Sequence, residues 1–439
     1  MSGIGYYILM KPLPVSNIRN LILSIAVLLI AGGIGYQLGT HQVSVGGGVA
    51  DRRVVVNMKQ PAGNTVDFSL FWDVWTKLTQ NYVDPKMIDQ QKLVYGAISG
   101  MVAAVGDPFT SFFPPQENTQ FKQDLGGAFE GIGAQLGTKD GRVIIVSPLH
   151  GTPAEAAGLK PNDFILKVDD VDTTGWTVDQ TVNKIRGPKG SKVKLLILHV
   201  QATSKPVEID IVRSTITVPS VVWWVKTPAE ITEISGASDA AQLLDKSQRI
   251  AYISLSRFGD TTNTDWNKAV ADILSKQQSG GKITGLVFDL RNNPGGYLDG
   301  AVYIASEFLR SGAVVSQVNS DGSVQNYPID RTGKLLDIPM VVLVNKGSAS
   351  AAEIVSGALH DDKRAKLIGE TTFGKGTVQT PFDLSGGAAV HVTTGKWLLP
   401  SGNSISQKGL TPDVVVTLSD TATATQDAQL AKGIELLLQ

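Results

Sequence analysis

The sequence predicts an α/β fold built from strand–turn–helix units. Two short apolar runs, at 285–290 and 340–344, have the length and composition of buried strands. Each run is followed by a turn rich in glycine, asparagine or serine, and then by apolar residues at helical spacing. The 439-residue chain is 42% hydrophobic and contains 46 glycines. This composition suits a folded α/β or β-rich protein of about two to four domains.

The composition argues against several classes of function. The 39 Lys and Arg residues nearly balance the 40 Asp and Glu residues. No basic run with interleaved aromatic residues is present, so we do not expect nucleic-acid binding. The chain has no cysteine, which excludes disulfides, a thiol nucleophile and a cysteine-type zinc site.

The N-terminal region contains a candidate membrane span. Residues Asn20 to Leu38 are apolar and uncharged, and 19 residues of helix cover roughly 28 Å, near the thickness of a bilayer core. Lys11 and Arg19 precede the span without any acidic residue, so residues 1–19 are expected to be cytoplasmic and the rest periplasmic or extracellular. The alternative is a signal peptide cleaved near residues 48–50. We favour an uncleaved single-pass anchor followed by a linker at 39–66.

Residues 67–126 read as a helical module. Apolar residues repeat at helical spacing from Phe68 to Val105, and the segment Tyr82–Pro85 divides them into two helices. The segment from Gly106 to Ser111 reads as a turn. We interpret the module as structural, serving packing or self-association.

Residues 127–214 form a second module. A Gly131-Ile132-Gly133 loop runs into a strand, a second strand covers Val143–Val146, and a helix is expected around Val178–Ile185. The segment resembles a PDZ domain of the circularly permuted bacterial type. In such a domain a bound peptide adds a strand beside a helix. The resemblance implies that N–H groups of residues 131–133 bind a C-terminal carboxylate, and that Leu136 with Val178 or Val182 lines an apolar pocket. Core packing is the alternative role for each apolar residue.

Residues 215–420 carry the remaining strand and helix patterns, and residues 421–439 a C-terminal helix. We expect strands at 250–255, 285–290, 340–344 and 375–384, a hairpin at 387–399, and helices at 265–277, 298–309 and from Ser350 to Leu359. Trp223 and Trp224 are expected to pack on this domain. A helix is expected at 426–438.

A serine-rich turn at 347–350 joins a predicted buried strand to a helix. Such a turn exposes a side chain at the edge of the sheet, next to helix N–H groups that can stabilise an oxyanion. Ser350 would need a base. None of His41, His150, His199, His360 and His391 lies in a convincing triad setting, although the sequence does not exclude His391. Lys375 between two glycines is the better candidate, provided that burial lowers its pKa.

Three segments resemble the carboxyl-terminal processing proteases, also called tail-specific proteases. They are KGSASAAEIVSGAL, GETTFGKGTVQ and DLRNNPGG. The resemblance implies a Ser350–Lys375 dyad with Gln379 orienting the lysine. It places the oxyanion hole at the N–H groups of Ala351 and of Gly295 or Gly296. It also implies a crotonase- and ClpP-like core of β-β-α units with an inserted PDZ domain, and no metal or cofactor.

The sequence thus predicts a membrane-anchored, extracytoplasmic serine endopeptidase that recognises protein or peptide substrates by apolar C-terminal tails. One alternative is a catalytically silent PDZ scaffold that only binds peptides. Another is a crotonase-like acyl-CoA enzyme, against which the PDZ insertion and the anchor argue. Whether a second copy of the chain or a regulatory partner binds is left open.

Overall fold

The computed structural model describes residues 66–199, 205–227, 229–231, 248–417 and 427–438. The chain divides into two units, residues 1–85 and 86–439. The expected anchor at 20–38, its cytoplasmic flank at 1–19 and nearly all of the linker at 39–66 lie outside the described residues. Within those ranges, no helix has the length and apolar character needed to cross a membrane.

The described part of the first unit is the helix α2, Ser69–Asn81. Its aromatic side chains contact one another, with the ring centroids of Phe71 and Trp72 5.1 Å apart. No residue of α2 is buried, and the side chain of Trp72 is 56% exposed. The helix ends before the predicted breaker at 82–85. A short 3-10 helix, η1, follows at Pro85–Met87.

The second unit begins with two helices and a short strand. These are α3, Gln90–Ala103, β1, Ser111–Phe113, and α4, Pro115–Gly126. The Asp89 carboxylate caps α3 by accepting hydrogen bonds from the backbone of Gln91 and Lys92. Val102 of α3, Phe112 of β1 and Ala388 share a small apolar core. This core holds the turn between α3 and β1 against a distant part of the chain.

The PDZ-like region is a compact β-structure with its own core. Its elements are β2, Ala128–Gly131; β3, Ala134–Lys139; β4, Arg142–Pro148; α5, Pro153–Ala156; β5, Phe164–Val168; β6, Val171–Asp172; α6, Val178–Ile185; β7, Lys192–Leu198; β8, Val207–Val212; and β9, Ser214–Thr217. The strand order is β3-β4-β5-β7-β8, with β6 on β5, while β2 pairs with β9. The bounds of α6 are the ones the sequence predicted. Strand β3 lies at an edge of its sheet, on the side where α6 packs.

A six-stranded sheet in the order β10-β11-β12-β15-β16-β19 forms the centre of the larger domain. Only β10 runs antiparallel to its neighbour; the other pairs are parallel. The strands are β10, Val221–Lys226; β11, Gln248–Leu255; β12, Lys282–Asp289; β15, Met340–Val344; β16, Lys366–Gly369; and β19, Val414–Val415. Parallel strands buried on both faces read as continuous apolar runs, which is why the sequence revealed β12 and β15.

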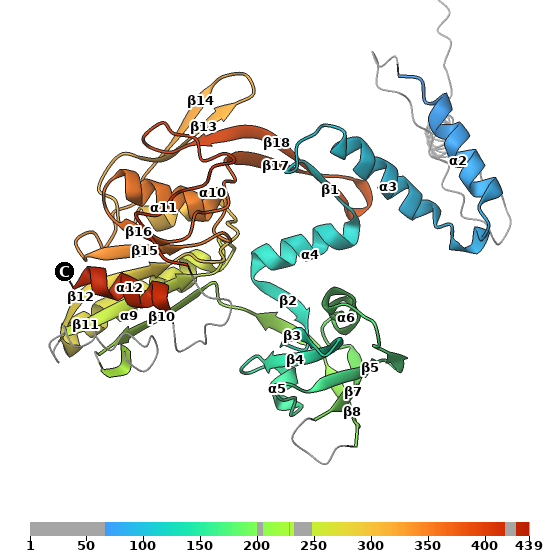
Figure 1. The fold of residues 1–439 in the computed structure, drawn as a ribbon, viewed down its shortest axis with the longest axis horizontal. Coiled ribbons are helices and arrows are strands. Elements are labelled where there is room, and N and C mark those ends of the chain that lie inside the picture. Colours follow the sequence, from blue (N-terminus) through green and yellow to red (C-terminus); the bar gives the residue numbers. More distant parts are fainter. Residues whose placement is uncertain (1–65, 200–204, 228, 232–247, 418–426, 439) are drawn as a thin grey trace, which may run out of the picture. The chain divides into compact units, whose positions relative to one another are not determined.

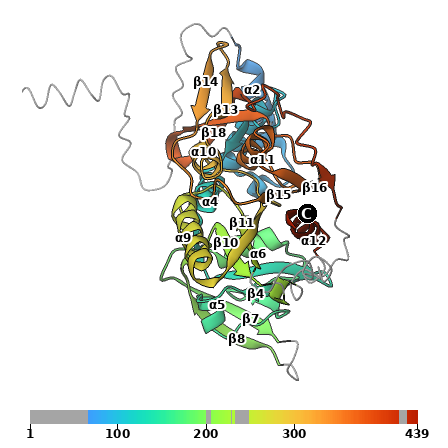
Figure 2. The same ribbon diagram turned by 90° about the vertical axis from the view of Figure 1, so that its left-hand side faces the viewer.

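Helices cover both faces of this sheet. They are α9, Thr262–Gly280; α10, Leu298–Ala305; α11, Ala351–Asp361; and α12, Ala428–Leu437. Side chains of α9, α10 and α11 share one core with Phe288 and Val342. Alternate residues, such as Val287 and Val341, face α12 in a second core. Figure 2 shows α9 and α12 on opposite sides of β11 and β15.

A second sheet extends from the core. It contains β13, Ala313–Asn319; β14, Val324–Pro328; β17, Thr377–Asp383; and β18, Ala389–Leu398. Strand β18 pairs with β13 near one end and with β1 near the other (Figure 1). The hairpin predicted within 387–399 is wrong, because this segment is the single strand β18. The hairpin turn lies earlier, at the 3-10 turn η2, Ser385–Gly387, where Gly386 and Gly387 adopt positive φ.

Other sequence expectations need smaller corrections. Helix α10 ends at Ala305, not at Leu309, and turns follow it. Lys375 lies in the loop before β17 rather than in the strand, and the pairing of β17 with β18 is irregular between Val378 and Gln379. The expected packing of the two tryptophans is confirmed. Trp223 packs against the main core, and the ring of Trp224 stacks on Tyr252.

Candidate active site

Ser350 occupies a strained position between strand β15 and helix α11. Its backbone has φ 52° and ψ −117°, a conformation that residues with a side chain rarely adopt. Strain of this kind persists only where surrounding contacts impose it, and it concentrates at functional sites. The residue is half-buried and immediately precedes Ala351, the first residue of α11.

The turn after β12 lies directly against Ser350. A Cβ atom added to Gly295 would lie 2.8 Å from Ser350 Cβ and 3.0 Å from the nitrogen of Ala351. Only glycine permits this approach, and its φ of +101° also favours glycine. The buried side chain of Asn293 supports the turn by donating to Leu255 O, while its backbone carbonyl accepts from Ala349 N. The two strand–turn–helix units are therefore joined at the serine.

The two glycines differ in their free hydrogen-bond donors. The N–H of Gly295 already donates to the side chain of Asn293 at 2.8 Å. Within the described ranges, the N–H groups of Gly296 and Ala351 have no acceptor. Unoccupied backbone donors beside a serine are what a developing oxyanion requires. The arrangement favours Gly296 over Gly295 as the partner of Ala351.

A buried carboxylate links the serine to the lysine loop. Glu353 Oε2 accepts from the backbone nitrogens of Ser350 and Lys375, each at 2.9 Å. Its Oε1 accepts from Gly374 N at 2.7 Å and from Thr372 Oγ1 at 2.5 Å. The residue has no exposed surface. Because one side chain holds both loops, the relative placement of the serine and the lysine depends on it.

We expect Glu353→Gln to lower both stability and activity. The amide nitrogen cannot accept a hydrogen bond, so one pair of donors loses its acceptor, at about 1–3 kcal/mol for each buried donor. Displacement of the two loops should also reduce kcat/KM by about 100-fold. Thermal unfolding and peptide hydrolysis measure the two effects.

Glu307→Gln is the matched control for this change. Glu307 is buried and also accepts four hydrogen bonds, from Trp266, Arg331, Lys334 and Leu335. It follows the far end of α10 and touches neither loop of the site. The Glu307→Gln variant should be less stable than the wild type but should keep its activity per folded molecule. Equal loss of activity in both variants would contradict the linking role of Glu353.

Lys375 is held in a partly buried loop next to an aromatic ring. Its Nζ lies 5.4 Å from the ring centroid of Phe109. Burial lowers the pKa of Lys375, while the negative charges of Asp107 and Glu353 oppose this shift. A lowered pKa is what a lysine needs to serve as a base.

Gln379 lies on β17, opposite Thr393 of β18. Its Nε2 donates to Thr377 Oγ1 at 2.8 Å and to Thr393 Oγ1 at 3.1 Å. In the described part of the chain, Lys375 Nζ hydrogen-bonds neither Gln379 nor Ser350 Oγ. The structure thus brings the loops of the serine and the lysine together at the backbone without a direct bond between the two side chains.

In the described part of the chain, no histidine hydrogen-bonds Ser350. The ring of His391 packs between Phe113 and Phe121, with centroids 4.4 and 4.8 Å away. Burial and the positive charge of Lys375 lower the pKa of His391. His360 is paired with Asp413. His150 and His199 lie in the PDZ-like region, where they contact Glu155 and Asp163.

Helix α12 is tied to the glycine turn by Arg291. The guanidinium binds Asp289 at the end of β12 and also Asp427 and Gln429 at the start of α12. The net shift of the Arg291 pKa is upward. Burial alone would lower this pKa, but the carboxylates of Asp289 and Asp427 outweigh burial. Asp289 also accepts a hydrogen bond from Tyr252. The turn that contains Gly296 is therefore anchored to the start of α12.

Comparisons with known proteins fit this geometry. The model of Peptidase family S41 matches residues 249–416, and the model of the PDZ domain matches residues 118–198. The chain is 39% identical over 335 residues to carboxy-terminal processing protease CtpA of Bacillus subtilis, covering 76% of this chain and 66% of that protein. It is 37% identical over 350 residues to the carboxy-terminal-processing protease of Bartonella bacilliformis, covering 79% and 74%.

The chain belongs to the carboxy-terminal processing protease family. This family consists of serine-type peptidases of the S41 class. A crystal structure assigned as an S41 protease of Bacteroides fragilis shares the fold, with a TM-score of 0.52 and 18% identity over 86% of this chain and 99% of that chain. The chain spans 66% of the length of the Bacillus relative.

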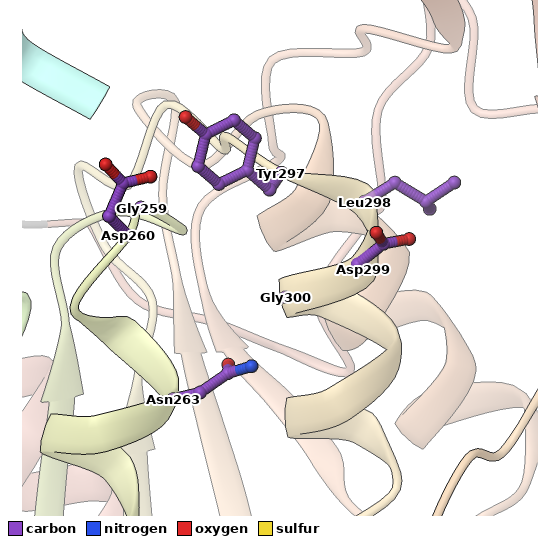
Figure 3. A pocket seen from close by; sticks show the side chains of 7 residues that line it. All are labelled: Gly259, Asp260, Asn263, Tyr297, Leu298, Asp299 and Gly300. Atoms are coloured by element: carbon purple, nitrogen blue, oxygen red, sulfur yellow. The ribbon is translucent and has the colours of Figure 1, made fainter. Parts of the chain in front are cut away.

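A recess borders the glycine turn of this family member. Figure 3 shows the side chains of Asp260, Asn263 and Asp299 around it, with the ring of Tyr297 at its rim. Its volume is about 290 Å³. Burial and the neighbouring Asp260 raise the pKa of Tyr297. Polar and apolar surface line the recess about equally, and its lining residue Tyr297 follows Gly296 directly in the chain.

The predicted tail-binding residues lie around an open strand edge. Gly133 has a φ of +79° and abuts Thr152, so a side chain has no room there. The side chain of Ile132 is buried in the PDZ core and Leu136 packs on that core, whereas Val178 and Val182 of α6 are half-buried and lie outside it. Gly131 belongs to β2, just before β3. These residues remain predictions as a binding site, and β3 offers the free edge that such a site requires.

Several residues that contact the candidate site were not predicted from the sequence. Glu353 had a detectable signal, because a serine followed three residues later by glutamate matches a capping box. Asn293 lies inside the recognised glycine-turn motif. Asp107 and Phe109 lie in the segment 106–111, which was predicted as a turn with a structural role. Thr393 gave no signal, because it comes next to this turn only through the pairing of β1 with β18.

Proposed function

We propose that the protein is a membrane-anchored, extracytoplasmic endopeptidase that uses a Ser350–Lys375 dyad and recognises substrates by their C-terminal tails. The observation that carries the proposal is the Glu353 carboxylate, which binds the backbone of both residues. The strained backbone of Ser350 and the unoccupied N–H groups beside it support the same reading. Family membership supports hydrolysis of peptide bonds.

In the proposed reaction, Ser350 Oγ attacks the carbonyl carbon of a peptide bond. Neutral Lys375 removes the hydroxyl proton as the C–O bond forms. The N–H groups of Ala351 and Gly296 stabilise the oxyanion. Protonated Lys375 then gives the proton to the leaving amine, and the C–N bond breaks to leave an acyl-enzyme. Water, activated by the same lysine, hydrolyses this ester and restores the serine.

The lysine must approach the serine for this reaction. A general base acts within hydrogen-bond distance, about 2.6–3.2 Å, and such bonds are often formed only in the substrate complex. The four-carbon stem of lysine is flexible, so rotation of the side chain away from Phe109 can bring Nζ to Ser350 Oγ. Burial favours the neutral amine that the first step consumes.

The PDZ-like region supports recognition of a substrate tail. A peptide can pair with the free edge of β3 and place its last side chain against Val178 and Val182. The N–H groups of residues 131–133 lie at the start of this strand and can receive the terminal carboxylate. Anchoring is inferred from the apolar run at 20–38.

The full chain should cleave an unfolded reporter protein that ends in three apolar residues. The same reporter with three acidic residues at its end should be cleaved with a KM about tenfold higher, equivalent to roughly 1.4 kcal/mol. Val182→Asp should remove most of this preference by placing a charge in the proposed pocket. Cleavage assays at varied substrate concentration measure it.

Val171→Asp is the control for the tail experiment. Val171 is 52% exposed on β6, which pairs only with β5. It should preserve the preference for an apolar tail. Equal cleavage of both reporters by the wild type would contradict tail recognition. Tail binding without any cleavage would instead favour the silent scaffold.

A further inference from the structure

The turn between α3 and β1 contacts the proposed catalytic lysine. Phe109 in this turn lies with its ring 5.4 Å from Lys375 Nζ. A cation over an aromatic face is stabilised by about 0.5–2 kcal/mol, depending on desolvation. The turn is half-buried and precedes β1, so it is fixed at one end by a sheet. A position beside the ring therefore gives the ammonium a defined place.

Asp107 holds the turn and joins it to β18. Its carboxylate accepts from Phe109 N at 3.1 Å and from Thr110 Oγ1 at 2.6 Å. It also accepts from Thr393 Oγ1. The pairing of Ser111 with His391 puts the turn next to Thr393.

The donor-to-acceptor direction of these hydrogen bonds determines how the side-chain amide of Gln379 is oriented. An ionised carboxylate only accepts, so the hydroxyl of Thr393 must donate its proton to Asp107. The oxygen of Thr393 is then left to accept, and it does so from Gln379 Nε2 at 3.1 Å. Thr377 accepts the second amide proton at 2.8 Å. Both donors of the amide are occupied, and no donor among the described residues reaches its carbonyl oxygen.

We propose that Asp107, Phe109 and Thr393 are positioning residues for Lys375. The inference rests on the proposed Ser350–Lys375 dyad. Phe109 receives the ammonium on its ring. Asp107, through Thr393, holds Gln379 with its carbonyl oxygen free to accept a hydrogen bond from the same ammonium. The α3–β1 turn thereby becomes part of the catalytic apparatus, although it is more than two hundred residues away in the chain.

Two charged groups act on the pKa of Lys375, and a third titratable group, His391, responds to the charge of Lys375. The negative charges of Asp107 and Glu353 raise its pKa, against the larger effect of burial, which lowers it. Burial lowers the pKa of His391, and the positive charge of Lys375 lowers it further. Removal of the charge of Asp107 should therefore lower the pKa of Lys375. Activity that requires the neutral amine would then appear at lower pH.

The first test is a matched pair of substitutions at Thr393 in the full chain. Thr393→Val keeps the shape and strand preference but removes the hydroxyl, and we expect kcat to fall about 10- to 100-fold. Thr393→Ser keeps the hydroxyl and should retain most of the activity. Hydrolysis of a peptide reporter and thermal unfolding are measured for both. Equal kcat in the two variants would overturn the role of Thr393.

The second test is the pH profile of kcat/KM for Asp107→Asn. We expect a lower plateau and an acid-side inflection displaced to lower pH. Repeating both profiles with His391→Gln removes the other titrating neighbour. Asp321→Asn is the control, because this exposed aspartate caps a similar turn by accepting from Ser323. Its profile should match the wild type. A lower plateau without displacement would make Asp107 merely structural and overturn the inference.

The third test separates the ring of Phe109 from its bulk. Phe109→Leu should lower kcat about tenfold, whereas Phe109→Tyr, which keeps an aromatic face, should restore it. Equal activity of the two variants would overturn the role of the ring. Lys375→Ala distinguishes failure of the proposed dyad from failure of the proposed positioning role. Cleavage by Lys375→Ala would defeat the dyad itself, whereas inactive Lys375→Ala with wild-type-like Thr393→Val would defeat the positioning role alone.

Discussion

Ser350→Ala is expected to abolish cleavage while tail binding is unchanged. Removing the nucleophile of a serine peptidase lowers kcat by roughly 10⁴- to 10⁶-fold, because only binding and the oxyanion donors remain. The serine lies at the N-terminus of α11, far from β3 in the chain, and its side chain is not needed for the bond from its backbone to Glu353. Hydrolysis of the reporter and binding of an apolar tail peptide are measured on the same preparation.

Ser356→Ala is the control for this substitution. Ser356 lies in the same helix, where its buried hydroxyl donates to Ala352 O within the helix. It should remain active, apart from a modest loss of stability. Cleavage by Ser350→Ala at a rate near that of the wild type would reject Ser350 as the nucleophile.

Lys375→Ala and Lys375→Arg are both expected to be inactive, by a factor of roughly 10³ or more. Arginine keeps the positive charge and the contact with Phe109, but it does not lose its proton in proteins. Failure of both variants therefore identifies a base rather than a structural cation. In the wild type, kcat/KM should rise with pH as Lys375 loses its proton. Burial lowers the pKa of this group, so the rise should lie below the ordinary lysine range.

The stability of the lysine variants provides the control for folding. Burial disfavours the charged amine, so the folded protein carries a cost at every pH below the pKa of lysine in the unfolded chain. Lys375→Ala removes this charge, and its melting temperature at pH 7 should not be much below that of the wild type. Full activity of Lys375→Arg would exclude a neutral amine as the base.

Local patterns in the sequence were sufficient for the elements and for several motifs. Strand β15 and helix α6 have the predicted bounds, because a buried parallel strand forms a short continuous apolar run and an amphipathic helix has a clear periodicity. The segment 387–399 was wrongly predicted as a hairpin. The prediction began at Gly387, although this glycine belongs to the turn before the strand, together with Gly386. Gly386 and Gly387 end β17 and allow β18 to run as one strand.

Three features of the site could be read from local sequence alone: a serine at a strand–helix turn, a lysine between two glycines, and a glycine turn after another buried strand. Each is a property of a few neighbouring residues. The contact of Glu353 with the loops of Ser350 and Lys375 could be seen only in the folded chain. The same holds for the bond from Gly295 N to Asn293, which leaves the N–H of Gly296 without an acceptor among the described residues. The hydrogen bond between Thr393 and Asp107 could likewise be seen only in the folded chain. These contacts depend on how strands pair across the fold, and strand pairing is set by the packing of the whole domain.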